Sequence, residues 1–85
     1  TILPSDNEAV LAYLRSSPEE TILCVANLAA TPRSATVRLP DHAGHRVHDL
    51  FGGAEFPDVT AHGEVTLTLG SRDFYWLTVS PPEGA

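Results

Sequence analysis

Three closely spaced histidines carry the side chains best suited to chemistry. His42, His45 and His48 recur at intervals of three residues, with Asp41 and Asp49 alongside. Imidazole and carboxylate groups at short spacing are ligands that zinc accepts. On a strand, however, His45 and His48 would point to opposite faces, and a loop with a central glycine provides no rigid cradle. We therefore interpret these residues as solvated loop histidines and predict no metal site.

The remaining acids and nucleophiles lack the partners that catalysis requires. Glu19 and Glu20 are adjacent on a polar turn, whereas a glycosidase needs opposed carboxylates about 5–10 Å apart across a cleft. Cys24 lies in the most apolar run of the chain, so we interpret it as an inert core thiol. The sequence sets no base beside the candidate serines, Ser16, Ser17 and Ser71. We predict no catalytic residue and no cofactor.

Two aromatic neighbours, Tyr75 and Trp76, are weak candidates for stacking on sugar rings. A stacking platform needs aromatic side chains side by side on one exposed face, and adjacent residues of a strand point apart. Core packing is therefore the favoured interpretation, with sugar binding as the alternative. Asn27 is more informative, because it interrupts an apolar run and a buried amide must be hydrogen-bonded. We predict that Asn27 ties the end of its strand to the next turn.

Size and charge restrict the possible functions. The chain has 85 residues, enough for one domain. Its net charge is −6, and its five Lys or Arg residues are all arginines. An acidic, lysine-free surface makes nucleic acid and anionic membranes poor partners. No apolar run approaches the roughly 20 residues of a membrane helix. The single cysteine fits a reducing compartment, and because Thr1 begins the chain without methionine, we expect a piece of a longer protein.

Short elements between frequent turns predict an all-β fold. Two runs separated by a polar turn, 10–15 and 21–28, are expected to form an antiparallel hairpin, although a helix over 8–15 competes for the first. Clean alternation of apolar and polar residues predicts half-buried strands at 34–39 and 64–69. A shorter strand at 46–51 should end in a turn at Gly52-Gly53, and the last strand spans 74–79.

These elements predict an antiparallel two-sheet β-sandwich with Greek-key connections over residues 1–80, followed by a tail or linker over 81–85. The strands at 21–28 and 74–79 are apolar on both faces, which predicts central positions in one sheet. The predicted core combines one apolar face of these two strands with the inward residues of the two half-buried strands. Its members are Ile22, Cys24, Val37, Val65, Leu67, Leu69, Phe74 and Trp76.

The opposite faces of the two central strands carry a second apolar set, Leu23, Val25, Tyr75, Leu77 and Val79. In a free sandwich the outer side of a sheet is wet. We therefore predict that this set forms an exposed interdomain docking surface, through which the excised domain would also self-associate. The alternative is an inward turn of the sheet that buries both sets.

Several segments together resemble a known family. The opening Ile2-Leu3-Pro4-Ser5-Asp6-Asn7 and the runs VLAYLR at 10–15 and TILCVANL at 21–28 resemble the start of the C-terminal β-domain of the α-amylase superfamily. The later segments DLFGG at 49–53, Phe56-Pro57, LTL at 67–69 and FYWL at 74–77 are most similar to the trehalose synthases. Ala26, where a second asparagine is common, and Phe51, where leucine or isoleucine is usual, depart from the pattern.

The resemblance implies a non-catalytic domain. Such enzymes interconvert maltose and trehalose, and their catalytic carboxylates sit on a preceding barrel, so no catalytic residue transfers to this chain. It also implies a cytoplasmic bacterial enzyme, the catalytic barrel as docking partner, and a maltokinase as a possible further partner. Three other functions stay open: a carbohydrate-binding module, a free-standing β-sandwich adaptor, and the C-terminal domain of another α-amylase-superfamily glucosidase.

Overall fold

The computed structural model describes residues 2–3, 5–50 and 56–81 of the chain. Within these residues the fold is all-β, with one short 3-10 helix, and no helix is long and apolar enough to cross a membrane. Residues 10–15 are strand, so the helical alternative for this segment is wrong. The elements are β1 (Val10–Ser16), β2 (Thr21–Asn27), β3 (Arg33–Arg38), η1 (Pro40–His42), β4 (Arg46–Asp49), β5 (Glu64–Leu69) and β6 (Phe74–Ser80).

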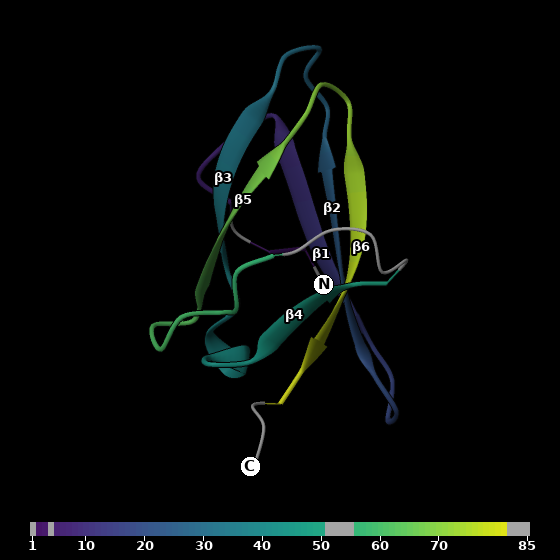
Figure 1. Ribbon diagram of the computed structural model, residues 1–85, viewed down its shortest axis with the longest axis vertical. Coiled ribbons are helices and arrows are strands. Elements are labelled where there is room, and N and C mark those ends of the chain that lie inside the picture. Colours follow the sequence, from purple (N-terminus) through teal and green to yellow (C-terminus); the bar gives the residue numbers. More distant parts are fainter. Residues whose placement is uncertain (1, 4, 51–55, 82–85) are drawn as a thin grey trace.

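The strands form two antiparallel sheets (Figure 1). The larger sheet has the order β1-β2-β6-β4, and the smaller sheet pairs β3 with β5. The predicted two-sheet fold is therefore confirmed, as is the prediction that β2 and β6 lie centrally in one sheet. Greek-key connectivity stays a prediction. The predicted turn at 52–53 lies outside the described residues, and so does the predicted tail apart from Pro81.

The core lies between the two sheets and consists of small and branched aliphatic side chains. The alternating strands β3 and β5 bury one face each, as predicted. This confirms Val37, Val65, Leu67 and Leu69 as core residues. Ala35 of β3 is also buried, and the larger sheet and the loops contribute the rest of the buried set: Val10, Ala12, Leu23, Val25, Leu39, Val47, Val59, Leu77 and Val79.

The predicted faces of the two central strands are inverted in the structure. Leu23, Val25, Leu77 and Val79, expected on an exposed docking surface, are buried between the sheets. Tyr75, the fifth member, is half-buried and packs against the same core. The predicted core residues Phe74 and Trp76 are instead 65% and 39% exposed, and Ile22 is half-buried. Cys24 is buried, but on the outer side of its strand.

Strand register explains the inversion. Arg15 of β1 lies opposite Ile22, Ile22 lies opposite Thr78, and Thr78 lies opposite His48 of β4. Directly opposed residues of antiparallel strands share a face of the sheet. Because Arg15 and His48 are exposed, the face that carries Ile22 must be the outer one. Alternation then sends Trp76 outward and Leu77 inward.

Asn27 ties three segments together at the end of β2. Its side chain is 2% exposed, and its Nδ2 donates to the carbonyl oxygens of Thr31 and Gly70, each at 2.9 Å, and of Leu69 at 3.4 Å. Its Oδ1 accepts from the N–H of Ala29 at 2.9 Å. The predicted structural role is confirmed, and it extends beyond the next turn to the end of β5.

The start of the chain links the edges of both sheets. Ile2 forms an antiparallel bridge to Tyr13 of β1, and Ser5 forms one to Val37 of β3. Next to that second bridge, Asp6 and Thr36 exchange two hydrogen bonds: the N–H of Asp6 donates to the Thr36 carbonyl at 3.3 Å, and the N–H of Thr36 donates to Asp6 Oδ1 at 2.8 Å. This segment therefore positions a carboxylate beside β3.

Candidate functional site

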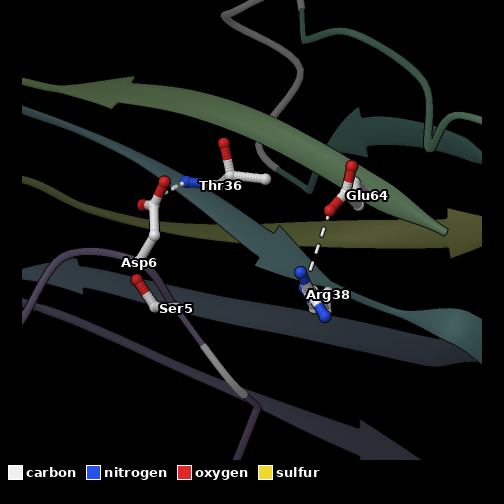
Figure 2. Close-up of a pocket in the computed structure, with 5 residues that line it drawn as sticks. All are labelled: Ser5, Asp6, Thr36, Arg38 and Glu64. Carbon is white, nitrogen blue, oxygen red and sulfur yellow. Dashed lines mark hydrogen bonds and ion pairs between the residues drawn. The ribbon is translucent and has the colours of Figure 1, made fainter. Parts of the chain in front are cut away.

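A groove on the smaller sheet gathers the charged side chains that come closest to an active site. It has a volume of about 450 Å³ and lies between the start of the chain and β3 (Figure 2). Two carboxylates, one guanidinium and two hydroxyls line it. The lining residues are Ser5, Asp6, Thr36, Arg38 and Glu64.

The charged groups of this groove are already engaged within the chain. Asp6 Oδ1 accepts the N–H of Thr36 at 2.8 Å, and Arg38 Nε lies 3.5 Å from Glu64 Oε2 (Figure 2). Nucleophilic catalysis requires a nucleophile within hydrogen-bond reach of a base. The groove instead holds structural pairs, and its residue types indicate a solvated surface.

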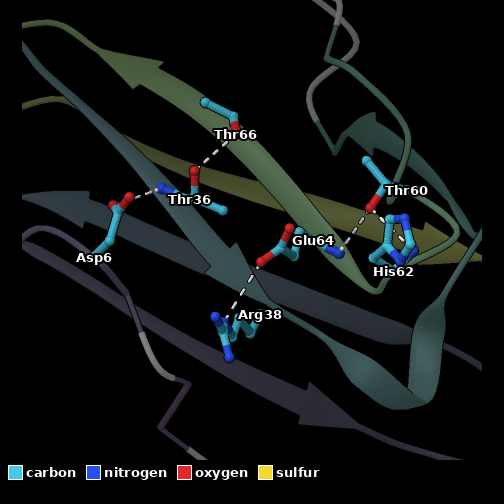
Figure 3. A network of polar contacts seen from close by, with 7 residues as sticks. All are labelled: Asp6, Thr36, Arg38, Thr60, His62, Glu64 and Thr66. Atoms are coloured by element: carbon cyan, nitrogen blue, oxygen red, sulfur yellow. Dashed lines mark hydrogen bonds and ion pairs between the residues drawn. The ribbon is translucent and has the colours of Figure 1, made fainter.

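Further polar pairs continue along the outer side of the smaller sheet, which we call the polar face. Thr36 Oγ1 lies 2.9 Å from Thr66 Oγ1, in register with the Arg38–Glu64 pair. At the start of β5, Thr60 Oγ1 accepts the backbone N–H groups of His62 and Glu64 at 3.3 and 3.2 Å (Figure 3). The polar face comprises Ser34, Thr36, Arg38, Glu64, Thr66 and Thr68.

The structure separates the three histidines. The rings of His42 and His45 meet edge to face, with centroids 5.1 Å apart, whereas His48 is exposed on the outer side of β4. The Nδ1 atoms of His42 and His45 are buried and have no hydrogen-bond partner among the described residues. No group of three or more His, Cys, Asp or Glu residues in that same part of the chain is arranged to hold a metal.

Glu19 and Glu20 lie on the turn between β1 and β2, as predicted, and both are exposed. The turn is held by Ser17, whose N–H donates to the Glu20 carbonyl at 2.8 Å. With His42 and His45, the two glutamates line an open pocket of about 310 Å³. As neighbours on one turn, they do not oppose each other across a cleft.

Cys24 is 4% exposed, and it lies opposite Tyr13 of β1. The pKa of the Tyr13 phenol is raised above its ordinary value, chiefly by hydrogen bonding with Cys24. A reactive cysteine needs an accessible thiol. The position of Cys24 is that of a buried structural residue.

Tyr75 and Trp76 point to opposite sides of the larger sheet, so they form no common platform. The Tyr75 ring packs edge to face against Phe56, with centroids 4.9 Å apart. Trp76 instead shares the outer side with Phe74, a surface that sequence reasoning assigned to the core. The outward direction of Trp76 follows from the register with Arg15, which only the paired strands provide.

We call this outer side of the larger sheet the apolar face. It extends over β1, β2 and β6 and includes Leu50. The N–H of Leu50 donates to the Trp76 carbonyl at 2.9 Å. Because Leu50 follows the outward-facing His48 by two residues, its side chain is on the same side. Its members are Leu11, Tyr13, Ile22, Cys24, Ala26, Leu50, Phe74 and Trp76.

Comparison with known proteins gives one family. The model of the "Maltogenic Amylase, C-terminal domain" family matches residues 1–76. Trehalose synthases from Pimelobacter sp. (strain R48) and Thermus thermophilus are each 37% identical to the chain, over 95% and 98% of its length. A "Trehalose synthase/amylase TreS" of Mycobacterium tuberculosis is 34% identical over 95% of the chain. The chain spans only 15%, 8% and 14% of these three relatives. It therefore belongs to the maltogenic amylase C-terminal domain family.

Proposed function

We propose that this chain is the non-catalytic C-terminal domain of an enzyme that interconverts maltose and trehalose. The observation that carries the proposal is the coverage: trehalose synthases match 95–98% of the chain, but the chain spans only 8–15% of them. The paired charges of the groove support a non-catalytic role, because its carboxylates serve as hydrogen-bond and ion-pair partners. The reaction belongs to the remainder of the enzyme.

The role that we propose for the domain is to stabilise the catalytic barrel by packing against it. Inter-domain interfaces within one chain bury about 600–1,500 Å², and a domain of this size can supply its share from one sheet. The resemblance further suggests a bacterial cytoplasmic enzyme and a maltokinase as an additional partner. Both suggestions rest on the family alone.

The test uses the full-length enzyme, the same enzyme ending before this segment, and the isolated chain. Trehalose formation from maltose is measured for each, together with the midpoint of thermal unfolding. We expect the full-length enzyme to be active, the isolated chain to be inactive, and the shortened enzyme to unfold at lower temperature. Turnover by the isolated chain, or a shortened enzyme of unchanged stability and activity, would refute the proposal.

A second candidate function, a carbohydrate-binding module, is favoured by one observation. Phe74 and Trp76 lie two residues apart on the same exposed side of β6, so their rings can present a common surface. Calorimetric titration with maltose and with a linear α-glucan separates the two functions. Saturable binding at sub-millimolar concentration, lost in Trp76→Ala, would favour the module over the purely structural domain.

A further inference from the structure

We propose that the apolar face is the surface through which this domain docks onto the remainder of its own enzyme chain. The inference rests on the proposed function, because it takes the catalytic part of that enzyme as the partner. The side chains that the sequence analysis assigned to docking face the core, so a different set of side chains forms the surface proposed here.

The apolar face is contiguous across three strands. One row runs from Leu11 through Ala26 to Phe74, and the next runs from Tyr13 through Cys24 to Trp76. Neighbouring strands lie about 4.8 Å apart, so side chains within a row are in contact range. These rows therefore form one surface rather than scattered apolar residues.

Much of this surface is open to solvent in the isolated chain. Phe74 is 65% exposed, Leu11 is 41% exposed, and Trp76 and Leu50 are each 39% exposed. Together these four side chains expose on the order of 400 Å², which lies within the range of the largest apolar patches on soluble monomers. Patches of that size are often functional.

Tethering decides between two protein occupants. A stable complex between separate molecules buries about 800 Å² per partner, and the four exposed apolar side chains supply only part of that area. A domain joined to its partner by the chain meets it at high effective concentration, so a smaller contact suffices. The relatives carry several times the length of this chain, which supplies such a tethered partner. A second copy of the domain is the weaker fit.

Charge at one end of the face specifies the partner further. Arg15 and Arg46 stand on the same outer side, beyond Ile22, and Glu20 lines a shallow pocket there together with Arg15 and Ile22. Complementary charges set the register of an interface. We expect an apolar patch on the catalytic part, bordered by charged groups that complement this end.

A sugar is less well suited to the same surface. Binding sites for small polar ligands carry several convergent hydrogen-bonding groups. Of the six side chains in the two rows, Leu11, Ala26 and Phe74 have none, and the other three offer only the Tyr13 hydroxyl, the Cys24 thiol and the Trp76 indole N–H. The rows thus resemble the apolar centre of a protein interface.

Thiol labelling in the full-length enzyme tests the inference. Phe74→Cys and Leu11→Cys place a thiol on the apolar face, and Thr66→Cys places one on the exposed polar face as a matched control. Each is reacted with a maleimide, and labelling at each position is followed by peptide mass spectrometry. Rates are normalised to those of the same variants unfolded in guanidinium chloride. Circular dichroism verifies folding, and two apolar-face variants ensure that one failure does not decide the result.

We expect both apolar-face cysteines to react about tenfold or more slowly than the Thr66→Cys control, because their positions are covered. Equal rates at the two faces would overturn the inference. Protection that disappears on dilution would assign the face to a second copy, and protection that requires added maltose or α-glucan would assign it to sugar binding. Either result would also overturn it.

Activity measurements keep this test separate from the proposed function. An enzyme that protects Phe74→Cys but does not interconvert maltose and trehalose refutes the proposed reaction and leaves the docking surface standing. An active enzyme whose apolar-face cysteines are unprotected refutes the docking surface and leaves the proposed reaction standing. Arg15→Glu adds a second readout: it should accelerate labelling of Phe74→Cys several-fold, because reversing this charge disturbs its complement on the partner.

Discussion

The outer sides of the two sheets differ in what they leave for a partner. On the polar face, directly opposed residues bond to each other: Ser34 with Thr68 at 3.0 Å and Thr36 with Thr66 at 2.9 Å. On the apolar face, Phe74 and Leu11 are in large part open to water. A surface whose polar groups are paired gains little from a contact, whereas exposed apolar area gains from being covered. This difference is the reason why we propose the apolar face, and not the polar face, as the docking surface.

The largest expected effect separates the core side of β6 from its outer side. Leu77→Ala should lower the free energy of unfolding by about 2–5 kcal/mol, because it opens a cavity between the sheets. Phe74→Ala removes a ring that is 65% exposed and should cost less than about 1 kcal/mol. Urea unfolding of the isolated chain measures both. A larger cost for Phe74→Ala would reverse the assignment of the two faces.

A smaller effect concerns the turn that leads into the polar face. Gly63 has a φ of +78°, and a Cβ there would lie 2.8 Å from Pro40 Cα. Gly63→Ala should therefore destabilise the fold by roughly 2–3 kcal/mol through strain and steric conflict. Gly44 is the matched control, with a φ of +76° and nothing within 4 Å of its added Cβ.

Gly44→Ala should cost only the strain of the left-handed backbone, about 1 kcal/mol. Thermal unfolding of both variants gives the difference, which isolates the conflict with Pro40. Equal losses at Gly63 and Gly44 would show that the approach of Gly63 to Pro40 adds nothing.

The pairing of hydroxyls on the polar face should be weak. A double-mutant cycle with Thr36→Val and Thr66→Val should give a coupling energy of about 0.2–1 kcal/mol, typical of an exposed cross-strand pair. The measurement is urea unfolding of the two single variants and the double variant. A coupling of several kcal/mol would mean that the polar face is a rigid, energetically important site.

The smallest effect is a change in the titration of Tyr13 on the apolar face. Because its pKa is raised by Cys24, the folded state holds the phenolic proton more tightly than the unfolded state does. The associated stability is present below the unfolded pKa and is lost as pH rises through the folded pKa. Phenolate absorbance of the isolated chain should show Tyr13 ionising at lower pH in Cys24→Ala. An unchanged titration would exclude the Cys24 contact as the cause.

The sequence was sufficient for the fold and insufficient for its orientation. Alternation on β3 and β5 identified their core side because each has polar residues on the other side. On β2 and β6 both sides are apolar, so periodicity could not distinguish Leu77 from Trp76. The distinction came from Arg15 and His48 on the edge strands, through a register that only the paired structure provides. The exposed apolar face was therefore expected on the right strands and on the wrong side of them.

Hydroxyl-radical footprinting of the native full-length enzyme tests whether the apolar face is covered, and it needs no substitution. Oxidation of Phe74 and Trp76 on the apolar face is compared with that of His62, which is exposed beside the polar face. We predict that Phe74 and Trp76 are oxidised several-fold more slowly in the full-length enzyme than in the isolated chain, while His62 is oxidised equally in both. Protection of His62 with Phe74 and Trp76 still reactive would contradict it.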